Sequence, residues 1–433
     1  MRIEFKATSF PSLSGVDMKV PVWCMTPHRG ACLHRFFDTC PISPSGRYLA
    51  LFGMPFENRL NAPGDLGHVV LIDLQTGEER VVAQTAGWEP QLGANLNWGI
   101  DDHHLYFNDV DCQTWEPQLV QLDPLRGTSE RTKGGVYHVS PDGRFAAAAS
   151  LEKMIRTQIG YGVLIPREKI GQNIGAPEDD GLYVTNLNTG ERRLVLSLAE
   201  AARYIPELDG GDLDDWELYG FHAKWSPQSD RLIFTIRRFP RHGAMRFNLL
   251  SSDDPKQQIR YDVLTLRPDG TEVCNAVPAR HWEPGGHHIN WFPHGKKLSM
   301  NLGGFANELR FVQVAAHGDD LKLMHADAIG SGHPTVYPGE RNVLTDAYAG
   351  EPVAFEDDTV PLRWVDLQSG RERCLARIGV RTEPQPNNAL RVDPHPAWDR
   401  SWRYVVFNGV APGENTRRVF LADLESVVNS SDQ

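Results

Sequence analysis

Four histidines stand at one position of a repeated sequence phrase, five residues before the turn that ends each copy. They are His222, His288, His333 and His395, whereas the other three copies carry Thr39, Asn95 and Val136 at this position. Only 16 of the 433 residues are histidines, so a chance match in four consecutive copies is remote. Because neutral imidazoles bind divalent metals, the pattern predicts that the four side chains share one ion: manganese, zinc or calcium. The alternative is a ring of histidines that are hydrogen-bonded to backbone and water.

Basic residues gather in two long connections, residues 151–180 and 238–258. Connections longer than about 15 residues are usually functional lids or binding loops. A guanidinium group binds a carboxylate with paired hydrogen bonds, so these loops predict a site for an anionic substrate. The alternative is that the arginines are solvated loop charges. The candidate substrate-binding residues are Tyr161, Arg237, Arg238, Arg241 and His242.

The elements that must position these side chains are short β-strands. The 39 glycines and 30 prolines fall between short β-rich runs, and no long apolar stripe recurs at helical spacing. One phrase, an apolar strand that enters a tight glycine turn, recurs at 71–78, 184–191 and 364–371, with looser copies that end at Gly127, Gly270 and Gly318. The sequence therefore predicts an all-β fold built from repeated hairpins.

The repeats predict a single seven-bladed β-propeller domain over residues 1–433. Seven copies of the first strand can be aligned, but only six of the glycine-turn hairpins. We therefore expect an N-terminal strand, within residues 2–7, to close the seventh blade. In such a ring the first strands line the central channel, and both long connections leave on the face where those strands begin. The histidines and the arginines are then expected at one end of the channel.

Charge and composition exclude several classes of protein. The net charge of −12 argues against nucleic-acid binding, which depends on the neutralisation of phosphates. No apolar run approaches the roughly 20 residues that cross a bilayer, so no membrane partner is expected. The first six residues alternate charged with apolar side chains, unlike a secretory signal, and the six cysteines form no C-x-x-C motif. We expect a cytoplasmic protein with reduced thiols.

Most of the chain resembles the seven-bladed β-propeller polysaccharide lyases, which include oligogalacturonate lyase, the propeller ulvan lyases and rhamnosyl-glucuronate lyase. A related propeller α-L-rhamnosidase, which acts on rhamnose linked to glucuronic acid, is similar as well. The resemblance is carried by residues 33–48, by Gly160-Tyr161-Gly162, by Gly332-His333-Pro334, and by the segment from Asp393-Pro394-His395-Pro396 to residue 423.

The resemblance implies roles for particular residues. Oligogalacturonate lyase binds manganese through three histidines and a glutamine, which implies His288, His333 and His395 here, with His222 in place of the glutamine. Ulvan-type lyases use a histidine and a tyrosine as base and acid and an arginine that neutralises the uronate. Tyr137 is similar to that tyrosine, and Lys153 or Arg156 stands in the place of the arginine. The rhamnosidase uses one histidine on the opposite face, in a segment similar to the one that contains His34.

These residue types suit β-elimination from a uronate. Removal of the weakly acidic proton on C5 requires that arginine, lysine or a metal neutralise the neighbouring carboxylate. A histidine can take the proton at neutral pH, and tyrosine or histidine can protonate the leaving oxygen. We therefore expect an oligosaccharide lyase with an anionic, uronic-acid-containing substrate. The alternatives are an exo-α-L-rhamnosidase that uses His34 and a non-catalytic propeller that binds protein partners.

Overall fold

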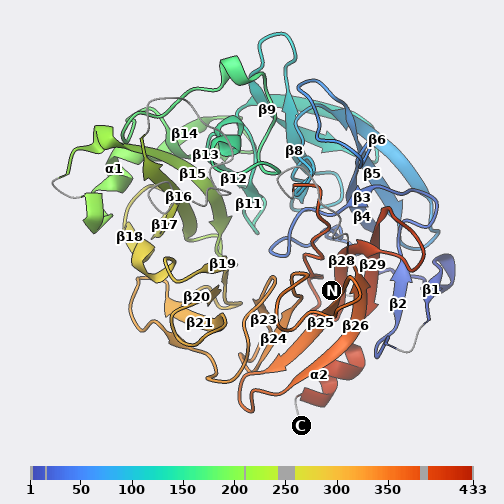
Figure 1. The fold of residues 1–433 in the computed structure, drawn as a ribbon. Helices are drawn as coiled ribbons and strands as arrows, with labels where there is room; N and C mark the ends of the chain where they lie inside the picture. The colour runs from blue at the N-terminus through green and yellow to red at the C-terminus, as the bar shows by residue number, and fades with distance from the viewer. Residues whose placement is uncertain (1–2, 15–16, 209–210, 242–258, 381–388, 432–433) are drawn as a thin grey trace.

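The computed structural model describes residues 3–14, 17–208, 211–241, 259–380 and 389–431. Its strands form antiparallel sheets that follow one another in chain order around a central axis (Figure 1). Five sheets have four strands each. They are β3 to β6 (Cys32–Leu33, Tyr48–Gly53, Gly67–Asp73, Glu79–Thr85), β7 to β10 (Asn97–Trp98, Leu105–Val110, Pro117–Asp123, Thr128–Lys133), β11 to β14 (His138–Val139, Phe145–Ala148, Gly181–Asn186, Arg192–Ser197), β15 to β18 (Trp216–Trp225, Leu232–Pro240, Arg260–Leu266, Cys274–Val277) and β19 to β22 (Gly286–Trp291, Lys297–Leu302, Arg310–Ala315, Lys322–Leu323).

The remaining strands form one nine-stranded sheet. A single bridge, between Gly379 and Val410, joins its two four-stranded groups. One group is β23 to β26 (Thr335–Val336, Asn342–Thr345, Thr359–Asp366, Glu372–Gly379). The other is β27 to β29 (Ala397–Trp398, Tyr404–Val410, Arg417–Asp423) with β2 (Val22–Cys24), to which β1 (Ser12–Leu13) adds an edge. The all-β propeller prediction is confirmed.

Short helices connect or cap the sheets. The α-helices in the described residues are α1 (Leu198–Ala202) and α2 (Glu425–Ser431), and α1 begins with a capping box between Ser197 and Glu200. The described 3₁₀ helices are Ala7–Ser9, Leu151–Arg156, Arg167–Lys169, Pro206–Leu208, Leu213–Asp215 and Ala279–His281. No helix in the described part of the chain is long and apolar enough to cross a membrane.

An N-terminal strand completes the last sheet, but it is not the predicted one. β2 pairs with β29, and Val22, Trp23 and Cys24 lie opposite Ala422, Leu421 and Phe420. The segment 3–6 forms no strand; instead the amides of Glu4 and Lys6 donate to carbonyls of the neighbouring sheet. The placement within residues 2–7 is therefore wrong. Residues 2–7 alternate charged and apolar side chains, whereas residues 20–25 form a continuous apolar run. Both patterns are compatible with a strand, so the non-local partner decides which segment joins the sheet.

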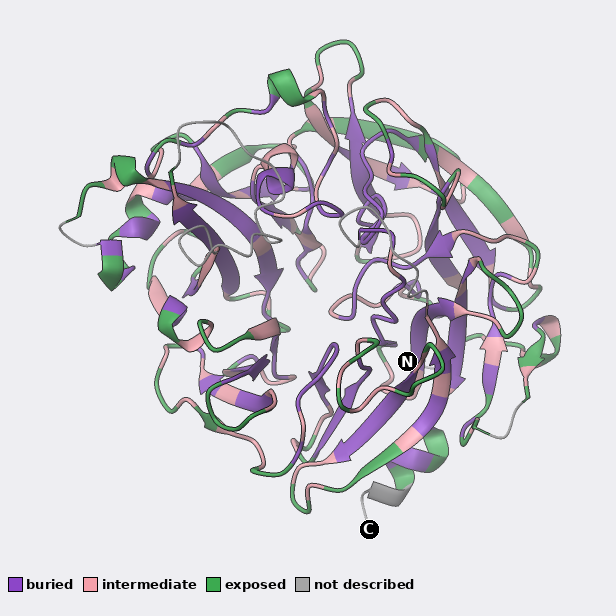
Figure 2. Ribbon diagram, in the orientation of Figure 1, coloured by how far each residue is buried: buried purple, intermediate pink, exposed green. Residues whose placement is uncertain are grey.

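Hydrophobic contacts between neighbouring sheets hold the ring together. Leu49 and Leu51 of β4, for example, share a buried cluster with Val419 and Leu421 of β29, which joins the two ends of the chain. Figure 2 shows buried residues concentrated on the inner strands, whereas long stretches of the outer strands are exposed. The glycines predicted to form hairpin turns have positive φ values, for example +78° at Gly77, where a side chain would strain the backbone. This rigid scaffold brings the starts of the first strands together on the axis.

Candidate active site

Three of the four predicted histidines meet on the axis. The ring centroids of His288 and His333 are 3.9 Å apart, and those of His333 and His395 are 4.4 Å apart. The ring of His222 makes no contact with those three rings among the described residues; it packs against Phe36, at 5.8 Å. Phe36 contacts the other three histidines as well. The repeat register therefore brings all four histidines around one aromatic ring, with His222 apart from the other three.

Irregular backbone directs these side chains toward the axis. The pairing of β15 with β16 shifts between Gly220 and Ala223, beside His222. The pairing of β19 with β20 shifts in the same way beside His288. The φ values of His288 and His395 are +60° and +49°, a region that L-residues rarely adopt. β-bulges and strained φ values cluster at functional sites, and the histidine position carries both.

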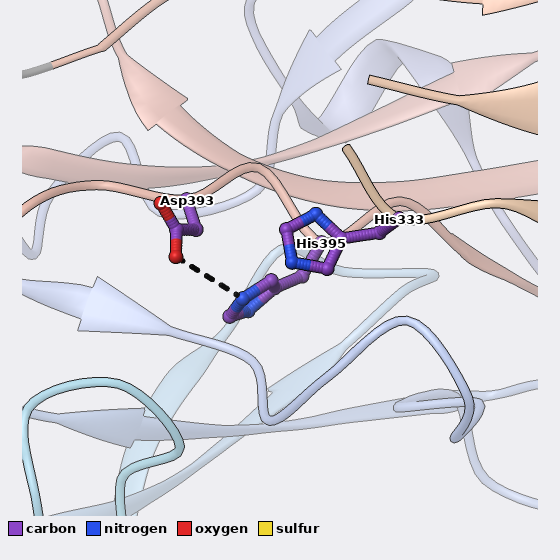
Figure 3. Close-up of side chains that lie close together, drawn as sticks. All are labelled: His333, Asp393 and His395. Carbon is purple, nitrogen blue, oxygen red and sulfur yellow. Dashed lines mark ion pairs between the residues drawn. The ribbon is translucent and has the colours of Figure 1, made fainter. Parts of the chain in front are cut away.

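His333, Asp393 and His395 form a cluster that can hold a metal ion (Figure 3). One donor atom from each lies within 4.8 Å of the others. Both ring nitrogens of buried His395 have no hydrogen-bond partner among the described residues. The Asp346 carboxylate, 2.9 Å from Nδ1 of His333, orients that ring so that Nε2 is its candidate ligand atom. The donor set therefore fits a divalent ion.

Tyr348 connects two of the axial histidines. Nδ1 of His288 lies 2.7 Å from the carbonyl oxygen of Gly332, so Nδ1 carries the proton and Nε2 accepts. The Tyr348 hydroxyl lies 3.0 Å from this Nε2 and 3.5 Å from Nε2 of His333. Burial lowers the pKa of both histidines well below the ordinary value of 6.5. Both rings are therefore neutral at neutral pH, as metal ligation or proton acceptance requires.

A cavity of about 570 Å³ opens beside the histidines, within the range of about 300–1,000 Å³ that is typical of ligand pockets. Gln158 and Tyr161 come from the first long connection, so that connection reaches the channel face as predicted. Of the predicted site residues, four line the cavity: Tyr161, His222, Arg237 and His288.

Arg237 is a buried cation in the wall of this cavity. Its side chain lies on β16, with the guanidinium carbon 3.3 Å from the centre of the Phe221 ring and Nη1 3.3 Å from the hydroxyl oxygen of Thr157. No carboxylate of the described residues forms an ion pair with it, and burial lowers its pKa. A buried charge without a counter-charge is costly. Arg237 is therefore prepared to bind an anionic group that enters the cavity.

His222 stands close to Arg237, on the neighbouring strand. Burial, together with the nearby cations Lys224 and Arg237, holds the pKa of His222 well below its ordinary value. Its Nε2 atom has no hydrogen-bond partner among the described residues. His222 lines the cavity, and a neutral imidazole can accept a proton from a ligand that reaches an unused ring nitrogen.

His34 and Tyr137 lie outside the lining of the cavity. His34 is fully buried, and burial lowers its pKa to about 3, so it cannot supply a proton at neutral pH. Tyr137 is also buried; its ring packs 5.3 Å from the His222 ring, with the guanidinium carbon of Arg35 4.8 Å from its centre. A substrate in the cavity would not touch either side chain in this structure.

Three further candidates are engaged in ion pairs within the protein. The Lys153 ammonium lies 2.8 Å from Asp180, and Arg156 lies 2.6 Å from Glu217. Arg238, adjacent to Arg237 on β16, lies 2.9 Å from Asp262. Arg156 and Arg238 are both buried, and each already has a carboxylate partner within the protein.

The last two candidates stand at the start of the second long connection. The side chain of Arg241 is exposed, and its backbone amide donates to the carbonyl oxygen of Asp215. His242 lies outside the described residues. Arg241 does not line the cavity.

Sequence reasoning missed several residues of the site. Arg391 and Asp393 form a buried ion pair beside the histidines, with Nε 2.9 Å from the carboxylate. The motif around His395 begins at Asp393 and already contained that residue, and Arg391 stands two residues before it. His287 directly precedes His288. Tyr348, Tyr261 and Trp282 carry no repeat signature that could have predicted them.

The fold and the cavity define a β-propeller with an axial histidine cluster and a buried arginine. No protein-family model matches the sequence, and no curated protein matches it either. Among solved structures, the chain is similar to an oligogalacturonate lyase in complex with manganese, at 14% identity and a TM-score of 0.64 over 97% of both chains. It is also similar to oligogalacturonate lyase from Vibrio parahaemolyticus, at 14% identity and a TM-score of 0.63 over 96% of this chain and 97% of the other. At this identity the likeness establishes the propeller fold.

Proposed function

We propose that the cavity is the active site of a lyase that cleaves oligogalacturonate-like, uronic-acid-containing oligosaccharides by β-elimination. The observation that carries this proposal is a buried arginine, Arg237, which has no carboxylate partner among the described residues and lies beside a neutral histidine, His222, in one cavity. A uronate supplies the missing negative charge and places its acidic C5–H bond next to the bound carboxylate. The similarity to two oligogalacturonate lyase structures supports the same class of substrate.

β-Elimination requires the protein to bind the carboxylate, to remove the C5 proton and to protonate the leaving oxygen. Arg237 binds the carboxylate and stabilises the negative charge that grows on it as the C5 proton leaves. His222 takes that proton, the C4–O bond breaks, and a C4=C5 double bond forms. The leaving oxygen must gain a proton, for which Tyr161 is placed: its ring lies 6.5 Å from the His222 ring. Burial raises the pKa of Tyr161, so the phenol keeps its proton at neutral pH. No water is consumed.

A divalent metal fits beside this site. His333, Asp393 and His395 would hold it, and when bound it would supply positive charge that offsets the charge of a uronate. The manganese in one oligogalacturonate lyase structure supports an ion of this kind.

We expect the metal to depend on His395 and not on His222. His395→Ala should remove the ion, because it deletes one ligand of the cluster. Asp346→Asn should weaken the affinity about 10- to 100-fold, since it disturbs the group that orients His333. His222→Ala should retain the metal. Elemental analysis of dialysed protein and titration with manganese or zinc measure these effects; equal metal content in all three variants would exclude this cluster.

The reaction class can be tested with one assay. Purified protein is offered oligogalacturonate, ulvan fragments and rhamnosyl-glucuronate, and the near-ultraviolet absorbance of an unsaturated uronate is followed together with released sugars. We expect absorbance to rise with oligogalacturonate, without incorporation of labelled water. Free rhamnose without absorbance would instead establish the rhamnosidase, and no cleavage of any of them would contradict the proposed function.

A further inference from the structure

The cavity has an aromatic wall that the proposed chemistry does not use. Tyr261 on β17 and Trp282, which follows the 3₁₀ helix Ala279–His281, both line the cavity. Their ring centroids lie 6.2 Å apart, with an angle of 51° between the ring planes. Trp282 is only partly buried, although its ring packs against the hydrophobic core between the fourth and fifth sheets. Part of a large aromatic surface therefore faces the cavity.

The Trp282 ring is fixed in position by its surroundings. Its indole nitrogen donates to the carbonyl oxygen of Val277, and its backbone amide donates to that of Ala279. A Cβ atom at Gly286 would lie only 3.0 Å from the indole ring, so the absence of a side chain there leaves room for the ring. A ring that is already ordered loses little conformational entropy when a ligand packs on it. This arrangement suits a binding surface.

The aromatic wall is continuous with the proposed carboxylate site. The guanidinium carbon of Arg237 lies 5.2 Å from the centre of the Tyr261 ring, and the Tyr261 ring in turn contacts Trp282. A ligand whose carboxylate reaches Arg237 therefore has its next unit beside the aromatic pair.

We infer that Trp282 and Tyr261 form a second sugar subsite, which binds the ring next to the uronate held by Arg237. A pyranose ring presents an apolar C–H face that packs on an aromatic surface, while its hydroxyl groups remain directed to polar groups and water. The subsite would make the enzyme select oligosaccharides over single uronic acids. This inference rests on the proposed function, because it places the scissile uronate at Arg237.

The test separates the two subsites by ligand length. Trp282→Ala should raise KM for di- and trigalacturonate about two- to tenfold, the range expected for loss of one aromatic contact. The inhibition constant of monomeric galacturonate, which needs only the Arg237 site, should stay unchanged. Trp282→Phe should restore most of the affinity for the oligomers, and kcat should change less than KM.

A matched control is Phe305→Ala. Phe305 is an exposed aromatic residue on the neighbouring hairpin of the fifth sheet, and it does not line the cavity. It should change neither constant, and thermal unfolding should show that every variant is folded. Equal weakening of monomer and oligomers in Trp282→Ala, or no change in either, would overturn the subsite. Absence of any unsaturated product from the wild-type protein would instead overturn the proposed function.

Discussion

Replacement of Arg237 by alanine should lower kcat/KM for oligogalacturonate about 30- to 4,000-fold. Arg237 is buried in the cavity wall and has no carboxylate partner among the described residues, so the substrate supplies its counter-charge. Truncation of one partner of a buried, hydrogen-bonded charge pair costs roughly 2–5 kcal/mol. The loss should appear in kcat as well as in KM, because the charge on the carboxylate grows as the C5 proton leaves. Steady-state kinetics by near-ultraviolet absorbance measure both constants.

Two further variants test whether the loss of activity in Arg237→Ala comes from the loss of the guanidinium group. Arg237→Lys should recover part of the activity, since it keeps the charge but loses the paired hydrogen bonds. Arg267→Ala serves as the matched control, because Arg267 lies in the same repeat, is exposed and pairs with Glu272 on the surface. It should leave the kinetics unchanged. Wild-type kinetics in Arg237→Ala, with the fold intact, would place the carboxylate site elsewhere.

The two arginines on β16 illustrate a feature of the site that the sequence alone could not predict. Arg237 and Arg238 are neighbours in one strand, so their side chains point to opposite faces of the sheet. The basic connection predicted that this region binds anions, but not which arginine faces the cavity. That depends on the strand register and on Asp262, which neutralises Arg238 from the next strand. Such pairing is non-local and leaves no trace in the local sequence.

The histidines were predictable because the fold is a repeat. Equivalent positions of successive first strands converge on one axis, so a shared register is enough to bring four imidazoles together. The register could not distinguish His222 from the others, because the separation depends on Phe36, a residue from a distant part of the chain that packs among the rings. The glycine turns were predictable for a local reason, since a positive φ favours glycine. The strand that closes the last sheet, β2, was not predictable from the sequence, because its partner β29 lies at the other end of the chain.

His222→Ala should lower kcat for oligogalacturonate about 10²- to 10⁴-fold, the usual contribution of a general base. The substrate still binds through Arg237, so KM should change much less. The His222→Ala variant should also retain the metal ion. That result would separate the proposed role of His222 as the base from the role as a metal ligand that the shared register predicted. A loss of metal together with activity would assign His222 to the ion. Unchanged kcat would exclude His222 as the base and leave His287 and His288, the other imidazoles that line the cavity among the described residues.

The pH dependence of the wild-type enzyme gives an independent test of this base. Burial and the cations Lys224, Arg237 and Arg35 lower the pKa of His222, whereas Asp38 raises it; the net direction is well below 6.5. A base acts in its unprotonated form, so kcat/KM should stay high at pH 6.5 and fall only as the pH drops through this lowered pKa. In His222→Ala the residual activity should lack that acidic limb. An acidic limb at or above pH 6.5, or one that persists in the variant, would mean that another group takes the C5 proton.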